Sequence, residues 1–195
     1  SSDLSDDSMM FQLPNTSLAG LQAHSIGVPW LPILSKGNEE EEINDLENGI
    51  RGASDVRLAF ERVKNDTETI DFPDELILKT DDLEIDALVV GALRSDYQKT
   101  RIERMCERLN LISYCPLWHH IPESHMESIV EHGFDVRIVS VSTDGLGEQW
   151  LGVKIDKKTL DSLSIISSQF RFNLDGEGGE FETIVVDAPH MKQLI

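Results

Sequence analysis

Residues 87–115 constrain the fold more strongly than any other part of the chain. Ala87 to Val90 form a continuous apolar run closed by Gly91, which is typical of a strand covered on both faces of a parallel sheet. Ser95 or the aspartate after it can cap the helix that follows, and Leu111 to Cys115 predict another strand. The apolar face of that helix consists of Ile102, Met105, Cys106 and Leu109. Strand, helix and strand in this order favour a parallel α/β unit.

The residues before this unit predict further helices and strands in a looser order. Met9 to Phe11 indicate a strand, and residues 18–26 indicate a helix that Gly27 ends. Residues 28–34 suit a strand, although their two prolines favour an edge or an irregular piece. A further helix is expected over residues 73–84, because a proline stands at its start.

Residues 36–72 differ in character from the segments around them. Glu39 to Glu42 form an acidic run, and we expect Gly49 and Gly52 to interrupt any helix there. Apolar residues return near a helix that we predict at 53–64. We interpret the stretch as an insertion or a mobile flap, and it carries no chemistry that we can name.

Beyond Pro116 the pattern predicts a second, smaller α/β lobe. Its expected elements are a helix at 122–132, a strand at 134–141, a helix at 156–168 and a strand at 181–186. The whole chain is therefore predicted to be an α/β protein. We expect an open, doubly wound, mainly parallel sheet in a first domain over 1–115, and the smaller lobe over 116–195.

The charge balance argues against nucleic acid as a partner. The 36 acidic residues outnumber the 17 Lys and Arg residues and leave a formal charge of −19, and no basic face is evident. No stretch approaches the roughly 20 consecutive apolar residues of a membrane helix, and the start SSDLSDDS lacks the features of a signal peptide. We therefore expect a soluble, cytoplasmic protein with no nucleic-acid or membrane partner.

Neither the cysteines nor the histidines support a metal site. Cys106 and Cys115 are the two cysteines, and their spacing matches no zinc or redox motif. Four histidines lack a carboxylate or thiol set at a metal-ligand spacing, so we interpret them as surface or capping residues: His119, His120, His125 and His132.

A first candidate site lies between the strand predicted at 87–90 and the helix after it. Ligands of open α/β sheets gather at the carboxyl ends of strands, and exposed amides at a helix start favour anions. The residues that could surround phosphates there are Gly91, Ser95, Tyr97, Gln98, Lys99 and Arg101. The alternative is that Lys99 and Arg101 are simply solvated and Ser95 only caps the helix.

A second candidate site is the segment Asp175 to Thr183, where a glycine loop enters a strand. Its three glycines permit positive φ and close approach of a ligand to the backbone. Glu177, Glu180 and Glu182 disfavour a bare phosphate and suit a cation, either magnesium or an organic ammonium group. The alternative is a β-turn with solvated acids, in which Glu180 and Glu182 share one face of the strand.

Two tryptophans stand in predicted loops. Trp118 follows Pro116, and Trp150 lies in a stretch rich in glycine. Aromatic side chains in loops often form the walls of ligand sites, but both indoles could equally close the core between two lobes.

Several strings occur in a characteristic order along the chain. They are GALRSDYQKTRIERMCERLNL from Gly91, then PLW, GF, GL with WLG, and GEGGEFETIVVDAP from Gly176. This order resembles the diphthine–ammonia ligase family of ATP pyrophosphatases. The resemblance covers residues 86–195 and, more loosely, Met10 to Pro29 with MFQLPN and LQAHSIGVP. EGGEFET is its most specific element.

The resemblance implies a fold like that of the adenine nucleotide alpha hydrolases, and a ligase that amidates diphthine. Diphthine is the modified histidine of archaeal and eukaryotic translation elongation factor 2. The implied substrates are ammonium and ATP, the latter with Mg²⁺. The carboxylate would be activated as an acyl-adenylate with release of pyrophosphate, after which ammonia would form the amide of diphthamide.

The resemblance also implies roles for the two candidate sites. The segment from Gly91 to Arg101 would border ATP, with Lys99 and Arg101 near the phosphates. An acidic glycine loop near tryptophans would receive the trimethylammonium group of diphthine. The expected substrate-binding residues are Trp118, Trp150, Glu177, Gly178, Gly179, Glu180, Glu182 and Thr183. We expect both segments to face one cleft.

The chain departs from the family at one point. Members begin with a strand and a Ser-Gly-Gly-Lys-Asp-Ser loop that holds the phosphates, and no such string occurs in these 195 residues. Either the chain is incomplete at its N-terminus or the protein has lost the loop. Two alternatives stay open: a catalytically inert relative that binds the elongation factor or a nucleotide, and another ATP pyrophosphatase that acts on a different carboxylate or on tRNA.

Overall fold

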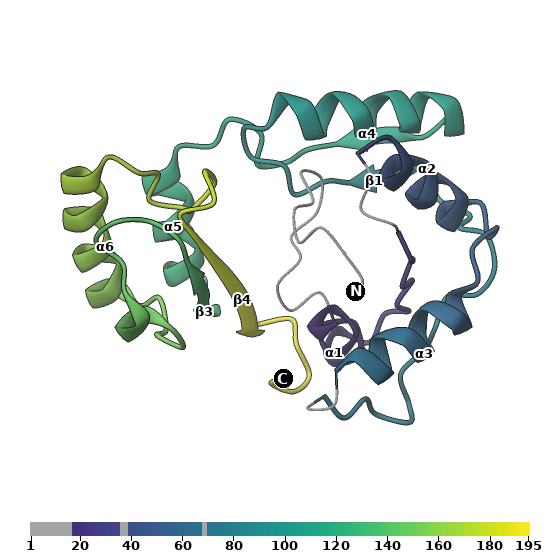
Figure 1. The fold of residues 1–195 in the computed structure, drawn as a ribbon, viewed down its shortest axis with the longest axis horizontal. Coiled ribbons are helices and arrows are strands. Elements are labelled where there is room, and N and C mark those ends of the chain that lie inside the picture. Colours follow the sequence, from purple (N-terminus) through teal and green to yellow (C-terminus); the bar gives the residue numbers. More distant parts are fainter. Residues whose placement is uncertain (1–16, 36–38, 68–69) are drawn as a thin grey trace, which may run out of the picture. The chain divides into compact units, whose positions relative to one another are not determined.

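The structure, a computed structural model, divides into two compact units between Trp118 and His119. It describes residues 17–35, 39–67 and 70–195, so the strand predicted at 9–11 lies outside the described residues. Helices and strands occur in both units, which confirms the α/β class (Figure 1). The sheets are short, so an open doubly wound arrangement stays a prediction. Within the described ranges, no helix is both long and apolar enough to cross a membrane.

The first unit combines helices with a short parallel sheet. Its elements are α1 (Leu18–Ile26), α2 (Glu39–Ile50), α3 (Val56–Asp66), β1 (Ala87–Val89), α4 (Asp96–Leu109) and β2 (Ile112–Tyr114). β1 and β2 run parallel, with Ala87 opposite Ile112 and Val89 opposite Tyr114. Helix α4 connects the two strands, which confirms the predicted strand–helix–strand unit.

Helix α4 contributes three of the five buried side chains in the hydrophobic cluster that it forms with α2. It begins after Ser95, whose Oγ accepts a hydrogen bond from the amide of Gln98 at 3.3 Å, and it ends at Asn110, which has a left-handed backbone conformation. The buried cluster consists of Ile102, Met105 and Cys106 from α4 with Ile43 and Ile50 from α2. The predicted apolar face of α4 is therefore confirmed.

The parallel sheet is covered on one face rather than on both. Leu88 packs against the core cluster, whereas Val89 is 67% exposed and Ile112 is 66% exposed. The expectation that residues 87–90 are covered on both faces is therefore wrong for this chain. The reason is that α4 packs on β2 from one side, so alternate side chains of each strand face away from the core.

Two predicted elements in the first unit do not form. Residues 28–34 are not a strand, and residues 73–84 are not a helix. Instead, an isolated parallel β-bridge joins the two segments. The backbone amide of Trp30 donates to the carbonyl of Ile77, and the carbonyl of Trp30 accepts from the amide of Lys79, each at 2.8 Å. Two further aromatic rings pack on the ring of Trp30: Phe60 and Phe72. These long-range contacts hold both segments in irregular conformations.

The acidic stretch is more helical than its composition indicates. The helix predicted at 53–64 is confirmed by α3, but α2 also forms and includes Gly49, so the prediction that this glycine interrupts any helix is wrong. The packing explains the glycine, because a Cβ there would lie 2.3 Å from Cδ1 of Ile33. Gly49 therefore permits close approach of α2 to the segment around Ile33.

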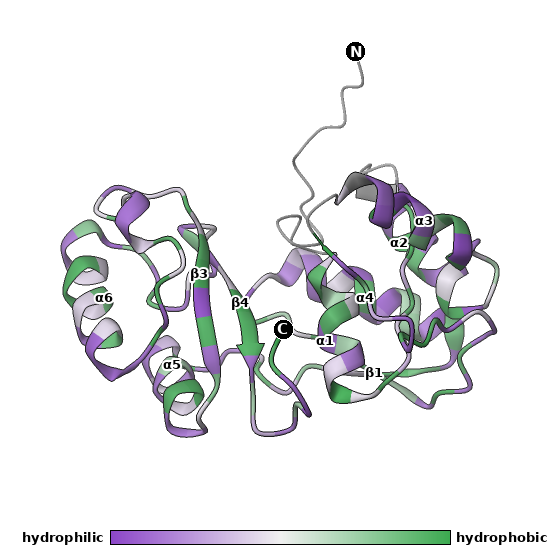
Figure 2. Ribbon diagram, turned by 90° about the horizontal axis from the view of Figure 1, so that it is seen from below, coloured by the Kyte–Doolittle hydropathy of each residue, from purple (hydrophilic) through white to green (hydrophobic). Residues whose placement is uncertain are grey.

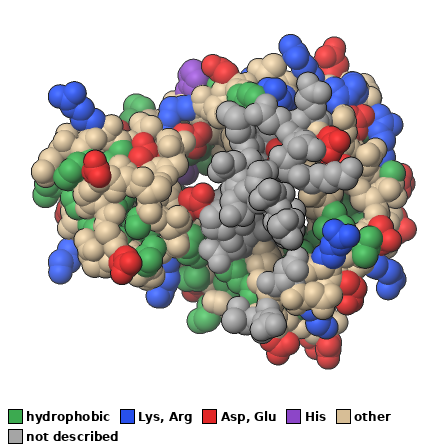
Figure 3. Space-filling model, in the orientation of Figure 1, with side chains coloured by type: hydrophobic (Ala, Val, Ile, Leu, Met, Phe, Trp, Pro, Cys, Tyr) green, Lys and Arg blue, Asp and Glu red, His purple; other side chains and the backbone are tan. Residues whose placement is uncertain are grey.

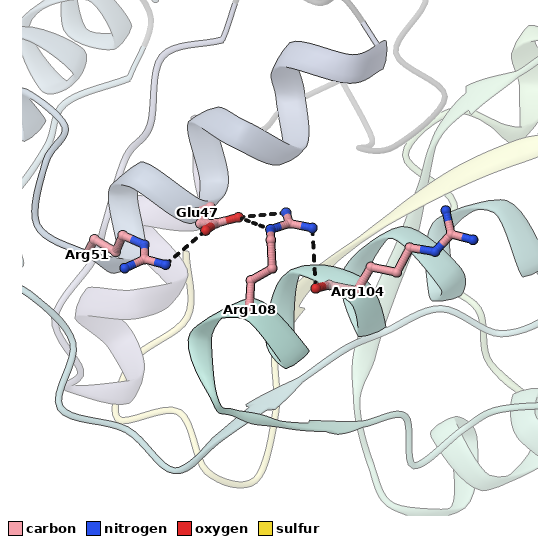
Figure 4. A network of polar contacts seen from close by, with 4 residues as sticks. All are labelled: Glu47, Arg51, Arg104 and Arg108. Atoms are coloured by element: carbon pink, nitrogen blue, oxygen red, sulfur yellow. Dashed lines mark hydrogen bonds and ion pairs between the residues drawn. The ribbon is translucent and has the colours of Figure 1, made fainter.

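A polar network joins α2 to α4 at the surface (Figure 4). Glu47 Oε2 accepts hydrogen bonds from Nε of Arg108 at 2.8 Å and from Nη2 at 2.6 Å, while Oε1 accepts from Arg51 at 3.1 Å. Arg108 also donates to the carbonyl of Arg104. The hydrogen bond from Arg108 is the main cause that lowers the pKa of Glu47 below its ordinary value of 4.5.

The second unit is a two-layer α/β structure. Its elements are α5 (Pro122–Glu131), β3 (Asp135–Val141), the 3₁₀ turn η1 (Glu148–Trp150), α6 (Lys157–Phe170) and β4 (Phe181–Asp187). They follow the predicted order of helix, strand, helix and strand. β3 and β4 pair antiparallel, with Ile138 opposite Thr183 and Val141 opposite Phe181.

The core of the second unit lies between this strand pair and its two helices. Figures 1 and 2 show α5 and α6 on the same side of β3 and β4. Hydrophobic and hydrophilic bands alternate along β3, as expected for a strand with one buried face (Figure 2). The buried side chains include Met126 from α5, Val136 and Ile138 from β3, Leu160 and Leu163 from α6, and Phe181 from β4.

Replacing Arg108 with alanine should lower the free energy of unfolding by about 1 kcal/mol, because it removes charge-assisted hydrogen bonds to Glu47. The measurement is urea unfolding at pH 7. Arg104→Ala is the matched control, since Figure 4 shows the Arg104 side chain pointing away from Glu47. An equal loss in both variants would contradict the role of the network.

The effect of Arg108→Ala should also depend on pH. A carboxyl whose pKa is lower in the folded than in the unfolded chain stabilises the fold above its ordinary pKa, here 4.5, and this contribution is lost as pH falls through the lowered value. The difference between wild type and variant should therefore be full at pH 7 and shrink below pH 4.5. A difference that grows on acidification would contradict the assignment.

Candidate functional site

The junction of β1 and α4 brings the first group of predicted residues together. Gly91 follows β1 and is exposed, and, apart from its chain neighbours, no atom of the described residues lies within 4 Å of the position that a Cβ would occupy there. Ser95 caps α4 through the amide of Gln98, as the structural alternative predicted. The glycine backbone is therefore open to a ligand, whereas the serine hydroxyl already accepts a hydrogen bond within the protein.

Lys99 lies in a local polar cluster on the first turns of α4. Its ammonium forms an ion pair with Glu103 and lies 5.2 Å from the centroid of the Trp118 ring. The hydrogen bond to Glu103 is the main cause that raises the pKa of Lys99 above its ordinary value. Lys99 therefore stays charged at neutral pH, and Trp118 belongs to the same group of side chains.

Arg101 and Tyr97 form a second cation–aromatic pair on the same helix. The guanidinium carbon of Arg101 lies 3.4 Å from the centroid of the Tyr97 ring. Tyr97 also packs against the core cluster of the first unit. The core thus supports the ring on which the cation stacks, and the two predicted cations both lie near the start of α4.

The burial of Phe181 determines where the glycine loop of the second unit lies. Phe181 is the first residue of β4 and is 3% exposed. Gly176 has φ 72°, and a Cβ on it would lie 2.6 Å from the carbonyl oxygen of Phe181. Gly179 also has positive φ, at 81°, but open space surrounds it. Glycine is therefore favoured at both positions by the positive φ, and at 176 also because a side chain would clash with Phe181.

Glu180 is hydrogen-bonded within this loop. Its Oε2 accepts from the amide of Gly178 at 2.8 Å, and its Oε1 accepts from the amide of Asn173 at 3.3 Å. The hydroxyl of Ser142 donates to the carbonyl of Gly179. Asn173 and Ser142 are not among the residues predicted from the sequence, because Ser142 lies 37 positions from Gly179 and only the fold brings them together.

The remaining loop residues lie beside this frame. Glu177 is half-buried, and its amide donates to the side chain of Asp175 at 3.4 Å. Glu182 and Thr183 are half-buried in β4, where Glu182 pairs with Ser140 of β3. The loop thus presents acidic side chains at the start of a strand that is anchored in the core.

Trp150 packs against the core of its own unit, so its indole has a structural role there. It closes the 3₁₀ turn η1 and packs, half-buried, against the core cluster that contains Phe181. Trp150 and the glycine loop therefore belong to one unit, whereas Trp118 and Lys99 belong to the other.

No metal centre is evident in the part of the chain that the structure describes, where no group of three or more His, Cys, Asp or Glu side chains could hold an ion. His132 ends α5, and its Nδ1 lies 2.7 Å from the carbonyl oxygen of Ser128. A pocket of about 340 Å³ along α5 and α6 includes the carboxylates of Glu123 and Glu127 but none of the predicted site residues. Figure 3 shows acidic and basic side chains interspersed over the visible face.

Comparison with known families identifies the chain. The model described as the diphthamide synthase N-terminal domain matches residues 2–69 and 52–113. The model described as the diphthamide synthase C-terminal domain matches residues 121–195. The chain belongs to the diphthamide synthase family. The two domain matches lie on either side of the division between the compact units of the chain.

Individual members of the family are similar to this chain over most of its length. The diphthine–ammonia ligase of Homo sapiens is 34% identical over 152 residues, which are 75% of this chain and 55% of the relative. That of Saccharomyces cerevisiae is 30% identical over 200 aligned residues, covering 94% of this chain and 27% of the relative. That of Danio rerio is 27% identical over 191 residues, covering 97% and 68%. The chain thus spans about half the length of its human relative.

Gly176 and Gly179 offer a matched test of the loop geometry. Alanine at either position should cost about 1–2 kcal/mol for left-handed backbone, and Gly176→Ala should cost at least about 1 kcal/mol more because its methyl group meets Phe181. Denaturant unfolding of both variants measures the difference. Equal losses would show that the close contact at Gly176 is not present.

Proposed function

We propose that this chain catalyses the amidation of diphthine with ammonium, with ATP as the activating substrate. The observation that carries the proposal is the acidic glycine loop held at the start of β4, because it joins three carboxylates to a backbone of fixed shape. Membership of the family and similarity to proteins named diphthine–ammonia ligase support the same activity. The protein substrate would be elongation factor 2 that carries diphthine.

ATP would lie at the junction of β1 and α4. The residues there fit an anionic ligand, since the exposed backbone of Gly91 precedes the start of a helix that carries the cations of Lys99 and Arg101. Tyr97 would hold Arg101 in place by stacking, and Ser95 and Gln98 would keep the first turn of α4 formed. The proposal includes an open, doubly wound sheet of the adenine nucleotide alpha hydrolase type, with Mg²⁺ accompanying ATP.

Diphthine would bind at the acidic loop of the second unit. A trimethylammonium group cannot donate N–H hydrogen bonds, so its recognition depends on nearby negative charge and on aromatic faces. Glu177 and Glu182 supply the charge, and Trp150 lies in the same unit as the loop. The exposed backbone of Gly178 and Gly179 and the hydroxyl of Thr183 would complete the surface.

The proposed reaction has two steps, activation of the carboxylate and formation of the amide. A carboxylate oxygen of diphthine attacks the α-phosphorus of ATP, so that pyrophosphate leaves and an acyl-adenylate forms. Ammonia, formed when ammonium loses a proton, attacks the acyl carbon, and the bond to AMP breaks. The nitrogen releases a second proton to solvent, and the amide results. Lys99 and Arg101 would stabilise negative charge in the first step, and the acidic loop would hold the substrate in both. A soluble enzyme of the cytoplasm suits this substrate.

Neutral replacement of the loop acids tests the proposal. Glu177→Gln with Glu182→Gln should weaken binding of the diphthine-bearing factor by at least about tenfold, which corresponds to about 1.4 kcal/mol, because the cation loses its counter-charges. Affinity for ATP should not change. Calorimetry measures both, and Glu131→Gln on α5 controls for loss of surface charge.

Three outcomes separate the possibilities. Loss of ATP affinity in the double variant would contradict the assignment of the loop to diphthine. Binding of the factor without ATP-dependent release of pyrophosphate by the wild-type chain would favour an inert binding module. Retention of tRNA at moderate salt would favour an ATP pyrophosphatase with another substrate.

A further inference from the structure

The carboxylate of Glu180 occupies a special position among the loop acids. Its two oxygens each accept a hydrogen bond from a backbone amide, Gly178 on one side and Asn173 on the other. Hydrogen bonds from amides to a charged carboxylate are stronger than those between neutral groups. Glu180 therefore links two separate points of the loop backbone.

The rest of the loop closes around this link. The amide of Gly176 donates to the carbonyl of Asn173 at 3.0 Å, and the amide of Gly179 donates to the carbonyl of Gly176 at 2.9 Å. From β3, the amide of Ser142 donates to the carbonyl of Glu180 at 2.9 Å. The backbone of the loop is thus tied at several points, and the Glu180 side chain joins two of them.

Gly178 supports the same interpretation independently. A Cβ on Gly178 would lie 2.5 Å from Oε1 of Glu180, although its φ is not in the left-handed region. Glycine at 178 therefore leaves space for the carboxylate rather than relieving backbone strain. The pair of Gly178 and Glu180 forms a local motif in which the small residue and the acid depend on each other.

We propose that Glu180 is a positioning residue, whose carboxylate fixes the glycine loop so that Glu177 and Glu182 stand ready for a cationic substrate group. A loop with three glycines would otherwise lose much conformational entropy when it binds a ligand. An internal carboxylate removes that cost in advance, and this preorganisation raises affinity without a new contact to the ligand. The ligand in this inference rests on the proposed function, whereas the shape of the loop does not.

Amide hydrogen exchange of the full chain, followed by NMR, tests the positioning role directly. Glu180→Ala should accelerate exchange at Gly178 by about tenfold or more, because a charge-assisted hydrogen bond is lost. Glu180→Gln should give an intermediate rate, since its single carbonyl oxygen can accept from one amide. Core amides such as Ile138 and Leu163 report whether each variant is folded. Unchanged exchange at Gly178 in a folded Glu180→Ala protein would overturn the proposal.

Binding of the diphthine-bearing factor separates this inference from the proposed function. We expect Glu180→Ala to weaken binding and Glu180→Gln to restore part of it, in parallel with the order of the loop. If binding is lost while Gly178 stays protected, Glu180 contacts the ligand directly and the positioning role is wrong. If the loop loses its protection and binding is unchanged, the positioning role holds and the proposed function of the loop fails.

Discussion

The burial of Phe181 is the constraint on which the second unit depends. Its ring packs edge-on against Phe172, with centroids 6.4 Å apart, and its backbone pairs with Val141 of β3. Because Phe181 starts β4, the residues just before it must leave the core abruptly, and Gly176 approaches its carbonyl closely enough to exclude a side chain. The hydrophobic core therefore determines the position of the acidic loop, and hydrogen bonds within the loop determine its shape.

The first unit depends in the same way on helix α4. The helix buries Met105 and Cys106 against α2, is capped at Ser95, and is joined to α2 through Glu47 and Arg108. This fixed helix carries Lys99 and its neighbouring cation at one end. In both units, buried apolar side chains thus fix the position of an exposed charged segment, which is the start of α4 in the first unit and the acidic loop in the second.

The sequence predicted those elements whose signals are local. The strand, helix and strand of 87–115 and the four elements of the second unit follow from hydrophobic periodicity and from caps such as Ser95. The errors at 28–34 and 73–84 arise from long-range contacts around Trp30, which periodicity cannot represent. The loop acids were likewise identified as a group, but the role of Glu180 depends on an amide at Asn173 whose position only the folded chain determines.

The central claim is that the acidic glycine loop receives a quaternary ammonium group. NMR titration of the labelled chain with a small trimethylammonium carboxylate, which imitates the diphthine side chain, tests it most directly. We expect saturable shifts at the amides of Gly178 and Gly179 and at the indole of Trp150. Shifts that centre instead on the acidic face of α5, or no saturable shift in the loop, would contradict it.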